Sequence, residues 1–132
     1  MDSTKSASEP DRPETTFARI LHDMNEAGEF RASFLVDAQG LPVAAVTSSY
    51  DTDTASAMAA LVRNVIEQAQ TRIDLAEADE VTVRGNDKTR LVSRYFTVGD
   101  ETLILVVVAP PYQAYRRLTN RAIKAVRAAW AS

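Results

Sequence analysis

The sequence contains no cysteine and a single histidine, His22. Without cysteine there is no disulfide framework, no thiolate metal site and no cysteine nucleophile, which is compatible with a reducing compartment. One histidine gives little material for a serine triad or a histidine metal centre. His22 also falls on the polar side of the first predicted helix, where we expect it to be solvated. We therefore expect a protein that is not an enzyme and that holds no metal or other cofactor.

Glycine and long apolar runs are also scarce. Each of the four glycines lies between predicted elements, and none forms a GxxxxGK or GxGxxG stretch, so phosphate-binding loops of those kinds are absent. The longest apolar run, 103–109, has the length of a strand and not the roughly 20 residues of a membrane span. The N-terminus lacks the apolar segment of a signal peptide. We expect a cytoplasmic protein without a transmembrane segment.

The chain has the size and balance of one globular domain. It contains 132 residues, of which 45% are hydrophobic and 25% are charged. Residues 1–14 mix Ser, Thr, Pro and charges with almost no apolar residues, which is typical of a disordered tail. We therefore assign a tail to residues 1–14 and a single domain to residues 15–131.

Apolar periodicity and turn residues predict an α+β domain. A helix is expected from Thr15 or Thr16 to Gly28, two strands at 31–37 and 42–48, and a long helix at 54–74. An acidic loop, 74–80, then leads to strands at 81–84, 90–98 and 102–109 and to a helix at 112–131. We expect the acidic loop to be solvated, the strand 102–109 to be central and the strand 81–84 to be an edge. The helices suffice to cover both faces of one antiparallel sheet.

The predicted long helix is apolar over an unusually wide arc. Its main apolar face includes Val62 and Ile66, and Leu61 with Val65 widen the arc to about 160°. Packing against a single sheet does not require so wide an apolar arc. Two explanations are open: the helix is deeply seated in the core, or Leu61 and Val65 face a second subunit.

The last predicted helix carries a marked charge asymmetry. It holds five cations and no acid, while residues 1–115 carry ten cations against eighteen acids. The five cations are Arg116, Arg117, Arg121, Lys124 and Arg127. They have three explanations: a solvated face, contact with an acidic partner or with acids of the same chain, or contact with anionic lipid or nucleic acid. We do not expect nucleic acid, because Tyr115 and Trp130 point towards the apolar arc and not among the cations.

The order of elements and one hairpin resemble the roadblock family, named for a dynein light chain and shared by prokaryotic regulators of small Ras-like GTPases. The matching segments are "GEFRASFLVDAQGLPVAAV", "DTDTASAMAALV" and "ETLILVVVA", within a resemblance that covers residues 16–130. The most specific pattern is apolar-apolar-Asp-x-x-Gly-Leu-Pro-apolar-Ala, which runs from Leu35 to Ala44.

The resemblance implies a five-stranded antiparallel sheet in the order α-β-β-α-β-β-β-α, with the long helix on one face and two helices on the other, as in roadblock and profilin-like folds. It also implies a homodimer in which the long helices pair and the edge strands near Val81 join. The expected dimer interface consists of Met58, Leu61, Val62, Val65, Gln68, Arg72, Val81 and Val83.

The function implied by the resemblance is a non-enzymatic homodimeric adaptor that scaffolds or modulates a small GTPase in bacterial or archaeal signalling. Such a role positions another protein's groups and supplies no catalytic residue. Accordingly, no arginine finger is assigned to Arg31, Arg84 or Arg90. The alternative is a small-molecule-sensing or kinase-associated module on a profilin-like fold. The five cations of the last helix form a second expected partner-binding face.

Overall fold

The computed structural model describes residues 13–47, 51–74, 76 and 79–131. Three helices are present, namely α2 (Pro13–Gly28), α3 (Thr52–Arg72) and α4 (Arg116–Ala131). Five strands accompany them, namely β1 (Ala32–Asp37), β2 (Pro42–Val46), β3 (Glu80–Arg84), β4 (Arg90–Val98) and β5 (Glu101–Ala109). The predicted α-β-β-α-β-β-β-α order is confirmed. The predicted tail lies outside the described residues except for Pro13 and Glu14, which begin α2.

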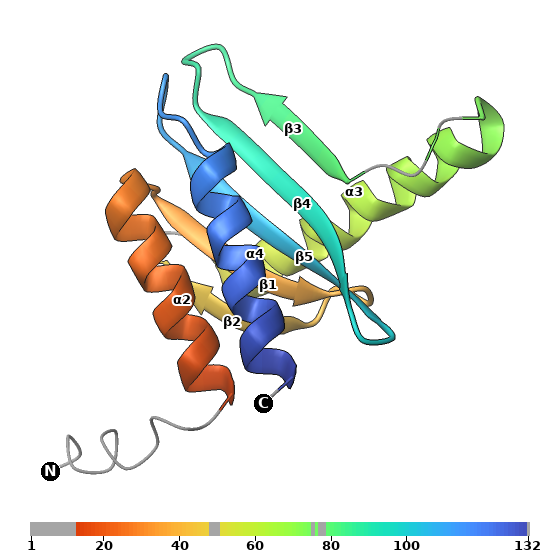
Figure 1. The fold of residues 1–132 in the computed structure, drawn as a ribbon. Helices are drawn as coiled ribbons and strands as arrows, with labels where there is room; N and C mark the ends of the chain where they lie inside the picture. Colours follow the sequence, from red (N-terminus) through yellow and green to blue (C-terminus); the bar gives the residue numbers. More distant parts are fainter. Residues whose placement is uncertain (1–12, 48–50, 75, 77–78, 132) are drawn as a thin grey trace, which may run out of the picture.

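The strands form one antiparallel sheet in the order β2-β1-β5-β4-β3. β5 is central and β3 is an edge, as predicted, and Pro42 lies on the opposite edge strand, where a missing backbone donor is tolerated. α2 and α4 lie side by side over one face of the sheet, and α3 crosses the other face (Figure 1). The predicted three-layer arrangement is therefore confirmed.

The two faces of the sheet carry cores of unequal size. Alternate residues of β5 point to opposite faces, so that Leu105 joins α2 and α4 in the larger core and Val106 joins α3 in the smaller one. On the α3 side, Ala59 is the one buried helix residue of that smaller core cluster among the described residues. α3 packs on β1 and β2, and its second half extends past the sheet (Figure 1). The α3 layer therefore buries less apolar surface than the layer formed by α2 and α4.

The β1–β2 turn has the conformation that its sequence pattern requires. The Asp37 carboxylate accepts hydrogen bonds from the backbone N–H groups of Gln39 and Leu41, both at 2.9 Å. Gly40 adopts a φ of +89°, and a Cβ at this position would lie 2.9 Å from the Cβ of Ala60 in α3. Glycine at position 40 is thus needed both for the turn and for the close approach of α3.

The ends of the three helices differ from the prediction, and α3 begins and ends two residues early, at Thr52 and Arg72. α2 begins at Pro13, because proline is well suited to the first helical position, where its missing N–H costs no hydrogen bond. α4 begins at Arg116 and not at Tyr112. Tyr112 has a φ of +65°, which is incompatible with a right-handed helix, and the Arg90 guanidinium donates to the carbonyls of Pro110 and Gln113. The chain from Pro110 to Gln113 is therefore a loop.

Gly40→Ala should lower the free energy of unfolding by about 2–3 kcal/mol, because the new Cβ adds a clash with Ala60 to the strain of a positive φ. The matched control is Gly99→Ala: Gly99 also has a positive φ, +60°, but has open space around the new Cβ. That control should lose only about 1 kcal/mol. Urea unfolding measures both values, and equal losses would contradict a steric role for the α3 contact.

Candidate functional site

Large exposed apolar side chains gather on the side of the molecule that carries α3. Leu61 is 64% exposed and Val65 is 61% exposed on α3, Ile73 at its C-terminal cap is 71% exposed, and Val83 on β3 is 54% exposed. Scattered single apolar residues are ordinary on protein surfaces. Several on one helix and the neighbouring strand instead indicate a surface that contacts another molecule. We name these four residues the α3–β3 surface.

The strand register places Val83 on the same side of the sheet as α3. Val83 pairs with Leu91, and Leu91 packs against the α3-side core. Directly paired residues of antiparallel strands point to the same face. Val83 is thus exposed on the α3 face, on a strand that lies at the edge of the sheet.

The predicted interface residues are arranged as follows. Leu61, Val65, Gln68, Arg72 and Val83 are exposed, and Val62 and Val81 are half-buried. The Arg72 guanidinium donates to the side-chain oxygen of Gln68 at 2.6 Å, so these two form one polar pair. The side chain of Met58 lies outside the described residues. The interface itself stays a prediction.

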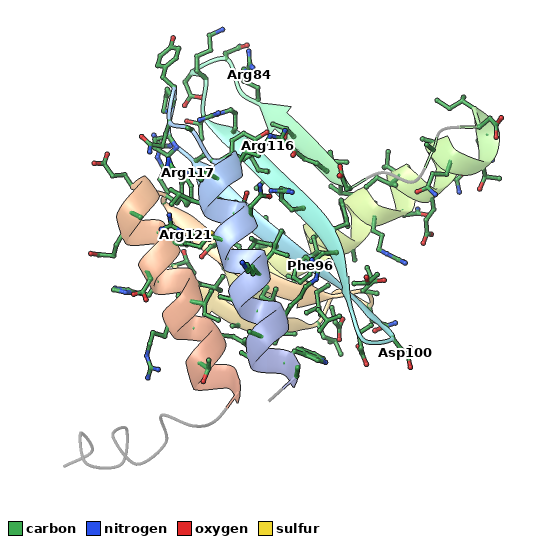
Figure 2. All side chains as sticks on the ribbon, in the orientation of Figure 1. Arg84, Phe96, Asp100, Arg116, Arg117 and Arg121 are labelled. Carbon is green, nitrogen blue, oxygen red and sulfur yellow. The ribbon has the colours of Figure 1, made fainter. Side chains whose placement is uncertain are left out.

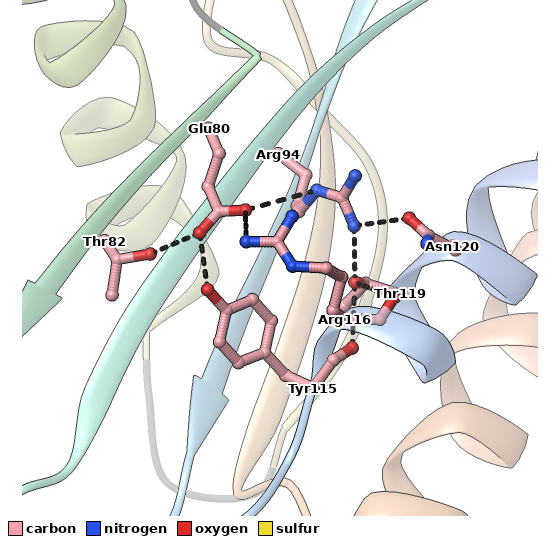
Figure 3. Close-up of polar contacts among 7 residues, drawn as sticks. All are labelled: Glu80, Thr82, Arg94, Tyr115, Arg116, Thr119 and Asn120. Atoms are coloured by element: carbon pink, nitrogen blue, oxygen red, sulfur yellow. Dashed lines mark hydrogen bonds and ion pairs between the residues drawn. The ribbon is translucent and has the colours of Figure 1, made fainter.

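The opposite side of β3 carries a polar cluster centred on Glu80 (Figure 3). Its carboxylate accepts hydrogen bonds from the hydroxyls of Thr82 and Tyr115, and lies 3.2 Å from the Arg116 guanidinium and 3.7 Å from that of Arg94. The side chain of Glu80 is only 15% exposed. The cluster joins the edge strand β3 to the start of α4.

Arg94 links the same cluster to the first turns of α4. Its guanidinium donates to the Thr119 hydroxyl at 2.8 Å and to the Asn120 side-chain oxygen at 2.7 Å (Figure 3). Thr119 in turn donates to the carbonyl of Tyr115 at 2.9 Å. Two strands and one helix end are thus held by charge-assisted hydrogen bonds.

The pKa of Glu80 reflects this environment. Burial by itself raises the pKa of the carboxyl group. The hydrogen bonds from Tyr115 and Thr82 and the positive charges of Arg116 and Arg94 outweigh burial, so the pKa of Glu80 lies below its ordinary value. The sequence prediction that residues 74–80 form a solvated loop is wrong for Glu80, because this residue begins β3 and meets two arginines from distant elements.

The structure divides the five predicted cations of α4 into two groups. Arg116 pairs with Glu80, and Arg127 donates to the Thr97 carbonyl at 3.1 Å and lies 5.6 Å from the ring centre of Phe96. By contrast, Arg117, Arg121 and Lys124 are exposed and form no ion pair with any residue that the structure describes. We name these three residues the α4 cation stripe. The sequence pattern grouped all five cations because it gives no information on the contacts of Arg116 with Glu80 and of Arg127 with Phe96.

Two hollows flank α2. One, of about 170 Å³, lies between α2 and α4 and is lined mainly by apolar residues with Asp23 and Arg121. The other, of about 310 Å³, includes His22, Asn25 and Glu26. The side chain of His22 is 59% exposed, as expected.

No cluster of His, Asp or Glu that could hold a metal ion occurs within the described parts of the chain. In those same parts, no helix has the length and apolarity to cross a membrane.

Comparison with known proteins identifies a family and a shared fold. The model of the Roadblock/LC7 domain matches residues 16–109. MglB from Myxococcus xanthus is 17% identical, with a TM-score of 0.70 over 90% of this chain and 87% of that one. A structure described as MglB with tetrameric arrangement is 17% identical, with a TM-score of 0.75 over 89% and 90% of the two chains. A Roadblock/LC7 domain from Streptomyces avermitilis is 16% identical, with a TM-score of 0.70 over 86% and 94%. No curated protein matches the sequence.

Glu80→Gln should reduce stability at neutral pH by about 1–3 kcal/mol, because Arg94 and Arg116 lose their shared carboxylate. A carboxyl group with a lowered folded-state pKa stabilises the fold above its unfolded-state pKa, and this contribution is lost as the pH falls through the folded-state pKa. The wild-type and variant proteins should therefore converge in stability in acid.

Chemical denaturation at several pH values measures this convergence. The control is Glu101→Gln, at an exposed position at the start of β5. A stability difference for Glu80→Gln that stays constant from neutral to acid pH would contradict an electrostatic role for the carboxylate.

Proposed function

Since the chain belongs to the Roadblock/LC7 family, we propose that it is a homodimeric adaptor that scaffolds or regulates a small Ras-like GTPase. The observation that carries the proposal is the concentration of large exposed apolar side chains on the α3–β3 surface. In this surface Leu61, Val65 and Ile73 from one helix accompany Val83 on an unpaired edge strand. The surface has the composition of an interface and lacks a group suited to catalysis.

The chemistry of the α3–β3 surface supports the proposed dimer. Two copies related by a twofold axis bring the same patch of each chain together, which suits a patch that is itself apolar. Pairing of the two β3 edges would satisfy their free backbone groups, and contact between the two α3 helices would cover Leu61 and Val65. An arrangement of several MglB copies, described for one structure as tetrameric, is in keeping with assembly by this fold.

The role towards a GTPase rests on positioning. In phosphoryl transfer, catalysis depends mostly on placing water, metal and charges around the nucleotide, so a second protein can alter the rate by holding loops of the GTPase in place. A rigid platform of two paired helices suits such a contact. Of the described arginines, Arg90 and Arg94 are engaged in bonds within the chain, so we assign no arginine finger to them.

Replacing Leu61 and Val65 together by Asp should weaken the dimer by at least about a hundred-fold, because charges would be buried in an apolar contact. Sedimentation equilibrium over a concentration series measures the dissociation constant. The control is Leu41→Asp, at an equally exposed position, 63%, in the β1–β2 turn. A double variant that dimerises with unchanged affinity would contradict the proposed interface, and a wild-type protein that is monomeric at micromolar concentration would exclude the dimer.

The GTPase role can be tested with purified small Ras-like GTPases encoded by the same genome. We expect one of them to bind at least about ten-fold more tightly in one nucleotide state, GTP analogue or GDP, than in the other, as measured by titration calorimetry. The Leu61 and Val65 double variant should lose this binding because the platform is not assembled. Equal affinity for both nucleotide states across all GTPases would contradict a regulatory role, and phosphate-release kinetics would separate stimulation of hydrolysis from scaffolding.

A further inference from the structure

We propose a second protein-docking surface on the side of the sheet opposite α3, formed by the exposed ring of Tyr112 and by the α4 cation stripe, and suited to an acidic surface of another protein. This surface consists of residues other than those of the α3–β3 surface. It goes beyond the dimer and GTPase contacts proposed above, and it does not depend on them.

Tyr112 is presented to solvent by a loop that is held in place. Its side chain is 87% exposed. The Arg90 guanidinium donates hydrogen bonds to the carbonyl of Pro110, at 2.8 Å, and to that of Gln113, so it holds the loop on both sides of Tyr112. Arg90 also lies 5.5 Å from the ring centre of Tyr115, whose hydroxyl is bonded to Glu80. The loop is therefore anchored in the polar cluster, and Tyr112 is pre-organised for contact.

The backbone conformation of Tyr112 is costly for its side chain. Four described residues other than glycine have positive φ, and Tyr112, at +65°, is the one aromatic residue among them. Glycine would adopt this conformation without strain. The aromatic ring is exposed, so it adds little to the stability of the core, and its backbone is strained. These two features indicate a role in recognition and not in stability. Tyrosine is also among the residue types that dominate binding energy at protein interfaces.

The α4 cation stripe begins one turn after this loop. Arg117, Arg121 and Lys124 follow the helical spacing of four and three residues and span about 10 Å of α4. Figure 2 shows Arg84, Arg116, Arg117 and Arg121 following one another from the upper end of β3 down along α4, while Asp100 lies at the other end of the molecule. The helix has no acid in its first turn. The stripe is thus a concentrated positive charge that forms no ion pair with the described residues.

The surroundings of the stripe favour a protein over a membrane or a nucleic acid. The neighbouring helix α2 presents Asp23 and Glu26, whose side chains are 75% and 73% exposed. A uniformly anionic surface would meet these acids as well as the cations and would be repelled by them, and the net charge of the chain is −3. A protein surface can place carboxylates opposite α4 only, with an apolar site for Tyr112.

A library of random twelve-residue peptides displayed on phage tests this surface directly. Selection against the wild-type protein should enrich peptides that combine carboxylates with apolar residues. A synthetic, fluorescein-labelled copy of an enriched peptide should bind at least ten-fold more weakly to the triple variant Arg117→Glu, Arg121→Glu, Lys124→Glu, as measured by anisotropy. The same peptide should also bind the Tyr112→Gly variant at least ten-fold more weakly. This variant should keep or raise the melting temperature, because glycine adopts a positive φ without strain.

Matched control variants distinguish binding at this surface from a general effect of charge or exposed apolar residues and from an effect of the dimer. Arg19→Glu changes an exposed cation on α2, and Leu41→Ser changes an exposed apolar residue in the β1–β2 turn; both should leave peptide affinity unchanged. The Leu61 and Val65 double variant should also bind the peptide normally, so that failure of the dimer and failure of this surface give different results.

Several results would overturn the proposal. One is the absence of enrichment, and another is an enriched peptide that binds the triple variant or Tyr112→Gly as tightly as the wild type. Retention on phosphatidylglycerol vesicles or on a 20-base-pair DNA duplex, lost in the triple variant, would assign the stripe to a lipid surface or nucleic acid instead. A loss of self-association in Tyr112→Gly, seen by sedimentation, would assign the loop to contact between copies of this chain.

Discussion

The burial of β5 on both faces is the constraint on which the rest of the structure depends. Its residues from Leu103 to Val107 are almost completely buried, and they alternate between the two cores. β5 also pairs with β1 on one side and β4 on the other, so it joins the N-terminal hairpin to the C-terminal meander. The segment 103–109 of this strand has no polar residue on either face and requires cover on both sides, which is why helices are found on both faces of the sheet.

The two helical layers meet this requirement to different extents. α2 and α4 pack against each other and against the sheet, and the stack of Phe17 on Trp130, with ring centres 5.8 Å apart, closes their free ends. α3 packs mainly on β1 and β2, and it leaves Leu61, Val65 and, on β3, Val83 exposed. An incomplete layer of this kind is consistent with a chain that completes its burial with a partner, which is the basis of the proposed dimer.

Arginine has two distinct uses on the α4 side. Arg90, Arg94 and Arg116 act within the chain, where they hold the Tyr112 loop, the first turns of α4 and the edge strand β3 around one carboxylate. Their planar guanidinium groups can bond to several acceptors at once, which suits this role better than lysine. The α4 cation stripe makes no such contacts with the described residues. Glu80, the buried carboxylate on this side of the sheet, is already engaged by Arg94 and Arg116.

The sequence by itself determined the order of elements, the central position of β5, the edge position of β3 and the turn at Gly40. These features follow from local periodicity, turn chemistry and the apolar character of single strands, which act between residues close in the chain. Only the tertiary structure decided that Glu80 leaves the acidic loop for a cluster with Tyr115 and Arg94, and that Arg116 and Arg127 are engaged while Arg117, Arg121 and Lys124 are not. It also decided that α4 begins four residues late, with Tyr112 held outward by Arg90. The contacts that decide these features join residues at least fourteen positions apart, so no local pattern could show them.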